Sequence, residues 1–253
     1  MIRKRIIGMI TVRDGIAVQS FGYSRYLPLG KPEILAANLD RWGADEIVVS
    51  CIDRQGAGPD MALIEKMAGK GLSTPLIYGG GIRGADDARA AIGAGADRIH
   101  CDALLHDDPA AVRAIGGAIG IQAVIGHLPL SIEGGRLECY DYRARRSLPL
   151  DAGLRELLAT GAISELMITD WRHEGEAGGF DPMLLAIGQL GVPLIAFGGI
   201  SDPLLARSLL AKREVVAVAI GNFLSYREHA IQTFREAVGD VGLRQAIYAK
   251  EEE

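Results

Sequence analysis

The stretch that decides the fold reads PLIYGGGIRGADDAR at residues 75–89, and the chain repeats its pattern as PLIAFGGISDPLLAR at residues 193–207. Each copy holds a short apolar run, a glycine-rich turn and the beginning of a helical pattern. A second pair flanks the first: EIV and GPD at residues 46–48 and 58–60 match ELM and GFD at residues 165–167 and 179–181. A strand, a glycine-rich turn and a helix that recur at half the chain length predict a duplicated half-barrel.

Length and composition fit one large α/β domain. A single α/β barrel takes about 250 residues. The chain has 253 residues, of which 49% are hydrophobic, and this is ample for a continuous core. No linker or shift in composition marks a domain boundary. We therefore expect a single domain over residues 1–253.

Eight short apolar runs rich in β-branched residues recur at the spacing of βα units, which predicts eight strands. They lie near residues 5–11, 46–52, 75–79, 97–101, 122–128, 164–169, 193–197 and 215–220. Asp108-Pro109 and Asp202-Pro203 each place an acidic cap and a first-turn proline at a helix start. The sequence thus predicts a (β/α)8 TIM barrel. One segment breaks the period: residues 130–147, with a turn at 133–136, are expected to form a β-hairpin inserted after strand 5.

Charge and cysteine content argue against several classes of protein. The formal net charge is −5, whereas a nucleic-acid footprint needs a clustered basic excess. Three cysteines, an odd number, give no disulfide framework and indicate a reducing compartment. The apolar run near the N-terminus is too short for a signal sequence or a membrane span. We therefore expect a cytoplasmic protein that binds neither nucleic acid nor membrane.

The cysteines raise the question of a metal site. Cys51 and Cys101 fall at predicted strand ends, and His100, His106 and His127 could join them as ligands. No CxxC or HxH spacing exists, so packing of buried thiols is the favoured role. We expect no metal and no organic cofactor.

The glycine-rich turns are candidates for phosphate binding. In a TIM barrel, functional residues lie in the loops after the C-terminal ends of the strands. Gly80-Gly81 and Gly198-Gly199 allow a phosphate to approach backbone N–H groups at a helix N-terminus. One such turn alone is explained more simply by turn geometry. Two matched copies, together with Gly221-Asn222 after strand 8, favour phosphate binding, because the loops after strands 7 and 8 are the usual phosphate site of this fold.

Four charged residues stand at predicted strand starts. Arg5, Glu46, Arg98 and Glu165 begin strands 1, 2, 4 and 6, which places two cations and two anions around the N-terminal mouth. They could close a ring of salt bridges across the barrel bottom. From composition alone, ordinary surface charges are the favoured interpretation.

Several short motifs together resemble the cyclase subunit of imidazole glycerol phosphate synthase, a barrel of histidine biosynthesis, over essentially the whole chain. They are KRII at 4–7, VRDG at 12–15, GADE at 43–46, GGGIR at 79–83, GADR at 95–98 and GFD at 179–181. The resemblance implies that a glutaminase docks at the barrel bottom and that ammonia passes through the barrel. It assigns an ammonia gate to Arg5, Glu46, Arg98 (a lysine in most members) and Glu165, and so favours a gate over surface charges.

The resemblance also completes the set of expected phosphate-binding positions, which are Gly80, Gly81, Asp102, Ala103, Gly175, Gly198, Gly199, Gly221 and Asn222. Asp102 replaces an asparagine of the family, and its charge would repel a phosphate unless a cation such as Arg83 compensated. Glu174 and Glu176 in the loop after strand 6 also disfavour a phosphate. The ligand is therefore expected to differ from the two-phosphate histidine precursor.

Both catalytic aspartates of the family are missing. The family places one aspartate at the end of strand 1 and one at the end of strand 5, and these positions hold Thr11 and Pro129. Threonine does not titrate usefully and proline has no proton to give, so the general acid and base are absent. His127 lies nearby and is the candidate to replace them.

Residues 18–20, 25–28 and 30–33 resemble a divergent branch of the same family, associated with surface-polysaccharide synthesis beside a glutaminase and a sugar amidotransferase. That resemblance implies a barrel that relays ammonia to an acceptor enzyme without closing an imidazole ring. Two alternatives stay open. One is a true cyclase/lyase of histidine biosynthesis with relocated catalytic groups, and the other is a non-catalytic barrel that binds a phosphorylated small molecule.

Overall fold

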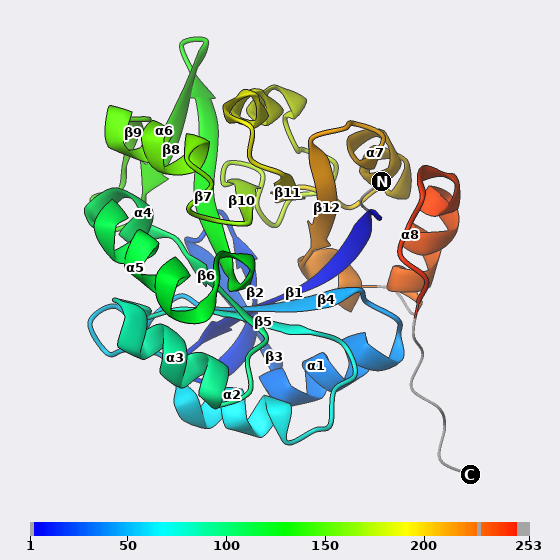
Figure 1. Cartoon of the computed structure of the whole chain (residues 1–253). Coiled ribbons are helices and arrows are strands. Elements are labelled where there is room, and N and C mark those ends of the chain that lie inside the picture. Colours follow the sequence, from blue (N-terminus) through cyan, green and yellow to red (C-terminus); the bar gives the residue numbers. More distant parts are fainter. Residues whose placement is uncertain (1–2, 227–228, 247–253) are drawn as a thin grey trace.

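Eight parallel strands close into a barrel in the computed structural model, which describes residues 3–226 and 229–246 (Figure 1). The barrel strands are β1 (Arg5–Arg13), β4 (Glu46–Cys51), β5 (Leu76–Gly79), β6 (Arg98–Cys101), β7 (Val124–Glu133), β10 (Glu165–Asp170), β11 (Leu194–Phe197) and β12 (Val215–Ile220). Each pairs in parallel with the next, and β12 pairs with β1 to close the ring. The predicted TIM barrel is confirmed.

Helices surround the strands (Figure 1). They are α1 (Pro32–Arg41), α2 (Met61–Ala68), α3 (Ala85–Gly93), α4 (Ala103–Asp107), α5 (Pro109–Ile119), α6 (Ala152–Ala159), α7 (Pro203–Leu210) and α8 (Ala230–Val238), with 3-10 turns η1 (Ile121–Ala123), η2 (Pro182–Leu190), η3 (Asn222–Ser225) and η4 (Gly239–Val241). The predicted caps are confirmed: Asp108 accepts a hydrogen bond from the amide of Ala111, and Asp202 accepts one from that of Leu204. Among the described residues, no helix is long and apolar enough to cross a membrane.

Side chains alternate between two cores because successive strand residues point to opposite faces. On β1, Ile7 and Met9 face the barrel axis, whereas Ile6 and Ile10 pack beneath the helices. The axial core consists of Ile7, Met9, Val48, Ile77, Ile125, Met167, Ile195, Phe197, Val216, Ala217 and Ala219. The same alternation turns the charged residues at the strand starts toward the axis.

The Gly-Ala-Asp motif that precedes strands β4 and β6 ties each strand to its neighbour. The carboxylate of Asp45 accepts a hydrogen bond from the amide of Ile6 on β1, at 2.7 Å. In the same way Asp97 accepts one from the amide of Leu76 on β5, also at 2.7 Å. The motif therefore fixes the start of one strand against the start of the strand before it.

Each half of the barrel carries an antiparallel extension after its first strand. β2 (Ile16–Phe21) and β3 (Arg25–Gly30) extend β1, and β8 (Arg136–Asp141) and β9 (Arg146–Pro149) extend β7. The hairpin expected in residues 130–147 is confirmed, but it does not break the repeat, since the first half has its counterpart. That counterpart is hard to see in sequence because β3 contains a proline and is mostly exposed. A shared Leu-Pro-Leu, at residues 27–29 and 148–150, marks the match.

The glycine-rich turns of the two copies pack against matched partners. A Cβ on Gly81 would lie 2.3 Å from the carbonyl oxygen of Gly58, and one on Gly199 would lie 2.7 Å from the amide nitrogen of Phe180. Both glycines have positive φ, +71° and +69°. The two repeated motif pairs of the sequence are therefore in contact, once in each half.

Gly79 has the shortest distance from an added Cβ to a neighbouring atom among the described glycines. A Cβ on this residue would lie 2.0 Å from Nε2 of His100, which faces it from β6. Only the absence of a side chain on β5 leaves room for the imidazole.

Gly79→Ala is therefore expected to destabilise the barrel by about 1–3 kcal/mol or more, because the added methyl overpacks the axis. Gly117→Ala is the matched control: Gly117 is an exposed residue of α5 with no atom within 4 Å of its Cβ position. Alanine there is expected to stabilise by about 0.5–1 kcal/mol through helix propensity. Urea unfolding of both variants provides the measurement. Equal stabilities for the two would contradict this account of the axis.

Candidate functional site

The four charges at the strand starts form a closed ring of ion pairs. Arg5 contacts Glu46 at 2.8 Å and Glu165 at 2.6 Å. Arg98 contacts the same two carboxylates, at 3.3 Å and 3.1 Å. None of the four side chains is more than 15% exposed, so the interpretation as ordinary surface charges is wrong. We call these residues the ion-pair ring.

Pairing keeps the ion-pair ring charged despite its burial. Burial alone would lower the pKa of Arg5, but Glu46 and Glu165 raise it above its usual value. Burial raises the pKa of Glu46, against the opposing effect of Arg5 and Arg98. Two cations and two anions balance, so the ring closes the barrel bottom without net charge. Arg98 is further held by Ser164 Oγ, at 2.8 Å from Nη2.

Two buried histidines occupy the axis above the ring. His100 and His127 are 4% and 2% exposed, and their rings meet edge to face with centroids 5.2 Å apart. Nε2 of His127 lies 2.7 Å from Oγ1 of Thr169 on β10. Burial lowers the pKa of His100 to about 4 and that of His127 well below its usual value. His127 is therefore a neutral group enclosed in the barrel, and not an open residue of the mouth.

Thr11 and Pro129, where the resemblance implies catalytic aspartates, lie toward the C-terminal ends of the strands. Thr11 has the inward orientation of Ile7 and Met9 on β1, and Pro129 on β7 is paired with Thr169. Thr11 is 8% exposed. Neither side chain supplies a titratable group.

An aromatic cluster lies over this end of the barrel. Tyr23, from the turn between β2 and β3, meets Tyr142, from the turn between β8 and β9, with ring centroids 4.7 Å apart. Tyr140 stacks on Trp171 at 3.9 Å, and the guanidinium of Arg172 lies 4.7 Å from the centroid of the Trp171 ring. The tips of the two matched extensions thus meet above the axis. We call Tyr23, Tyr140, Tyr142 and Trp171 the aromatic cover.

The expected phosphate positions of the second half come together around one cavity. It has a volume of about 220 Å³, and its lining includes Gly175, Gly198, Gly199, Gly221 and Asn222. The Asn222 amide is not free, because Nδ2 donates to the carbonyl of Ser20 at 2.6 Å and Oδ1 accepts from the Ser20 amide at 3.2 Å. The donors that line this cavity are therefore backbone N–H groups and the hydroxyl groups of Ser201 and Tyr226.

The first half differs at the equivalent place. Asp102 accepts a hydrogen bond from the amide of Ala103, the donor that a phosphate would need. Burial raises the pKa of Asp102 to about 6, and Arg143 opposes this effect. Arg83 is not the compensating cation, because its Nε contacts Asp87 at 2.8 Å. The carboxylate of Asp102 thus takes the place in the turn after β6 where a phosphate would bind.

Glu174 has a role that its sequence position does not suggest. It is 2% exposed and accepts hydrogen bonds from Ser20 Oγ at 3.0 Å and from the amide of Tyr23 at 3.3 Å. Its carboxyl group therefore holds the β2–β3 extension against the loop after β10. It lines both the 220 Å³ cavity and a second cavity of about 80 Å³. Burial raises the pKa of Glu174 to about 7.

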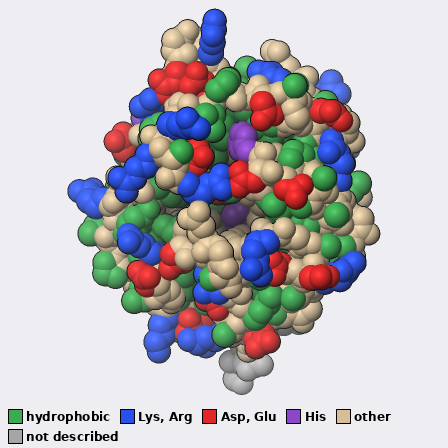
Figure 2. All heavy atoms as spheres, turned by 90° about the vertical axis from the view of Figure 1, so that its left-hand side faces the viewer, with side chains coloured by type: hydrophobic (Ala, Val, Ile, Leu, Met, Phe, Trp, Pro, Cys, Tyr) green, Lys and Arg blue, Asp and Glu red, His purple; other side chains and the backbone are tan. Residues whose placement is uncertain are grey.

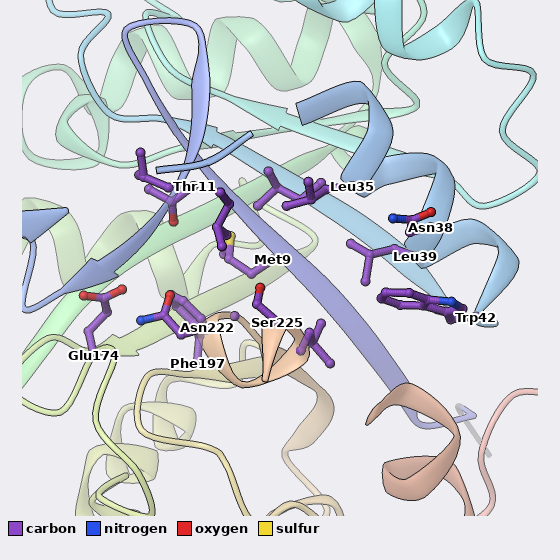
Figure 3. A pocket seen from close by; sticks show the side chains of 15 residues that line it. Met9, Thr11, Leu35, Asn38, Leu39, Trp42, Glu174, Phe197, Asn222 and Ser225 are labelled. Atoms are coloured by element: carbon purple, nitrogen blue, oxygen red, sulfur yellow. The ribbon is translucent and has the colours of Figure 1, made fainter. Parts of the chain in front are cut away.

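The second cavity is largely apolar (Figure 3). Leu35 and Leu39 of α1 and Trp42, directly after this helix, lie on one side of it, and Glu174 and Asn222 lie on the other. The 220 Å³ cavity is the larger of the two and carries the expected phosphate positions, so it is the better candidate for a ligand.

The cysteines have a packing role. Cys51 and Cys101 are 4% and 3% exposed, and burial raises the pKa of each to about 12. Among residues 3–226 and 229–246, no group of three or more potential ligands could hold a metal ion. On the face shown in Figure 2, acidic and basic side chains are mixed, so neither sign forms a continuous patch there.

Comparison with known proteins fits this geometry. A family model described as histidine biosynthesis protein matches residues 5–230. A protein of Vibrio vulnificus (strain YJ016) with the provisional name imidazole glycerol phosphate synthase subunit hisF2 is 29% identical over 238 residues, 91% of this chain and 86% of that protein. Imidazole glycerol phosphate synthase subunit HisF of Acidobacterium capsulatum is 33% identical over 209 residues, 80% of this chain and 82% of its own length. HisF of Hyphomonas neptunium is 27% identical over 248 residues, 96% and 98% of the two chains.

The ion-pair ring, the matched glycine turns and these similarities agree, and they confirm the family that the sequence motifs resemble: the chain belongs to the histidine biosynthesis protein family and is a barrel of the HisF type.

Proposed function

We propose that this chain is the barrel subunit of a glutamine amidotransferase complex and relays ammonia without closing an imidazole ring. A glutaminase docks at the end that carries the ion-pair ring, and ammonia enters the barrel there. The acceptor enzyme beyond the mouth is a sugar amidotransferase. The observation that carries the proposal is the contrast between the two ends: four paired charges form the bottom, whereas Thr11 and Pro129 leave the top without the acid/base pair.

The intact ring supports passage at the bottom. Each arginine bridges both glutamates, so displacing a single side chain opens the ring while the other three charges keep partners. A structural ion pair needs only two residues, whereas this ring takes one charged residue from each of four strands. We further propose that the complex of barrel, glutaminase and acceptor enzyme works in the cytoplasm.

A true cyclase/lyase is the second candidate, and Glu174 favours it. A buried carboxyl group with a pKa near 7 can exchange a proton near neutral pH. It lies beside the cavity that holds the expected phosphate positions. Turnover of the ribulosyl histidine precursor with free ammonia decides between the candidates, because the relay barrel makes no imidazole product. Phosphate binding with neither turnover nor a glutaminase partner would instead indicate a ligand-binding barrel.

In the complex that co-purifies with the tagged chain, Arg5→Ala is expected to uncouple glutamine hydrolysis from nitrogen transfer to the acceptor. With glutamine as nitrogen source, transfer to the acceptor should fall several-fold and ammonia should appear in solution, because the ring no longer closes the entry. With free ammonium supplied, transfer should stay near the wild-type rate. The measurement is the ratio of nitrogen transferred to glutamine hydrolysed.

Arg235→Ala is the matched control for that variant. Arg235 on α8 forms a buried ion pair with Asp45 at 2.9 Å, outside the ring, and its side chain is 10% exposed like that of Arg5. Breaking either pair costs about 3–5 kcal/mol. Only the ring variant should change the coupling ratio. Unchanged coupling in Arg5→Ala, or equal loss in both variants, refutes the gate assignment.

Inorganic phosphate is expected to bind in the second half only. Backbone amides line the 220 Å³ cavity there, whereas Asp102 occupies the equivalent donor in the first half. In an NMR titration, the amide signals of Gly199 and Gly221 should shift and those of Gly81 and Ala103 should stay. The variant Asp102→Asn should add a response at Ala103. Shifts at Ala103 in the wild-type protein would contradict the assignment.

Glu174→Gln is expected to change how stability depends on pH. The folded pKa of about 7 lies above the ordinary value of 4.5, so the wild-type protein loses stability relative to the variant as pH rises from 4.5 through 7. The difference approaches about 3 kcal/mol above pH 7. Unfolding midpoints at pH 4.5 and pH 8 measure it, with Glu176→Gln as control because that side chain is exposed. In the cyclase assay, Glu174→Gln should abolish any imidazole product if Glu174 is the acid or base.

A further inference from the structure

The histidine pair on the barrel axis is built in a way that packing alone does not explain. His100 and His127 come from the adjacent strands β6 and β7, and both point inward between the ion-pair ring and the aromatic cover. Room for the His100 ring exists only because Gly79 carries no side chain. An apolar residue would fill this place without any polar atom to satisfy.

Three imidazole nitrogens of the pair lack hydrogen-bond partners within the described part of the chain. They are Nδ1 and Nε2 of His100 and Nδ1 of His127. A buried polar atom without a partner costs about 1–3 kcal/mol, and such atoms are rare in proteins. Two further orphaned groups, the Tyr142 hydroxyl and Trp171 Nε1, belong to the aromatic cover. One more unpaired atom, Gln232 Oε1, lies on the outer helix α8, so half of the unpaired atoms of the described residues belong to the histidine pair.

The chemistry of these atoms selects the kind of molecule that fits. Burial lowers the pKa of both imidazoles, so each is neutral, with one N–H donor and one acceptor nitrogen. His100 presents both of its nitrogens, whereas His127 presents only Nδ1 because its Nε2 is paired with Thr169. Neutral rings give an anion no opposite charge, and they do not offset the cost of removing a cation from water. A small neutral molecule that both donates and accepts hydrogen bonds matches them best.

We propose that His100 and His127 form a binding site for one small neutral hydrogen-bonding molecule on the barrel axis, and that the molecule bound during turnover is ammonia. The second half of this inference rests on the proposed function. Ammonia has three N–H donors and one lone pair, so it can accept from the N–H of one ring and donate to the bare nitrogen of the other. Water has the same chemistry and is the resting occupant that ammonia displaces.

The isolated full-length chain tests binding without any partner enzyme. Its imidazole ¹⁵N signals are followed by NMR while ammonium chloride is added at alkaline pH, where ammonia is abundant, and at neutral pH, where ammonium dominates. The ring signals of His100 and His127 should shift in a saturable manner at alkaline pH only. His106 and His173, outside the axis, serve as internal controls. The ammonia site is refuted if the His100 and His127 signals do not shift with ammonia, or if they shift equally with ammonium at neutral pH. This holds whether or not water contacts the rings.

His100→Leu removes two of the unpaired nitrogens and keeps an apolar filling of the axis. The response of His127 to ammonia should then weaken several-fold, whereas His106→Leu should leave it unchanged. In the complex with the glutaminase, His100→Leu should also lower the coupling ratio several-fold. Ammonia binding with unchanged coupling would overturn the role in transit. If the chain binds ammonia but Arg5→Ala leaves the coupling ratio unchanged, the binding site is supported and only the proposed function is refuted.

Discussion

The rest of the structure depends on the pairing of four buried charges at the bottom of the barrel. A buried charge is tolerable only when an opposite charge stands within hydrogen-bond reach, and here each of Arg5, Glu46, Arg98 and Glu165 has two such partners. The ring forms only if β1, β4, β6 and β10 start at the same height along the axis and the first side chain of each strand faces the axis. It therefore fixes which residues of these four strands face the axis, and His100 on β6 is one of them.

The two ends of the barrel have diverged to different degrees. At the bottom the ring is complete. At the top the duplicated glycine turns persist in both halves, yet Asp102 takes the donor of the first turn, while the second turn opens onto a 220 Å³ cavity. Between them lie Thr11 and Pro129, whose side chains have no titratable group. The matched extensions meet through Tyr23 and Tyr142, and Glu174 anchors the first extension from below. The bottom of the barrel is thus closed by paired charges, and its top is covered by aromatic side chains.

Much of the fold could be predicted because its signals are local. The eight apolar runs and the Asp-Pro helix starts each act within a few residues, and each forms the element that it predicts. The β2–β3 extension was not predictable in this way, since Pro28 and an exposed strand hide its pattern. Glu174 was predicted as a charge that repels phosphate, but its partners Ser20 and Tyr23 lie about 150 residues away in sequence.

The sequence by itself determined the barrel and its internal duplication, because these follow from residue type and spacing, and its resemblance to the family singled out the four residues of the ion-pair ring. Only the tertiary structure decided that the ring is closed, that Asp102 binds the neighbouring amide, and that His100 and His127 face each other with unpaired nitrogens. Those features depend on strand register and side-chain direction around a closed barrel. Residues that are brought together in this way share no motif in the sequence.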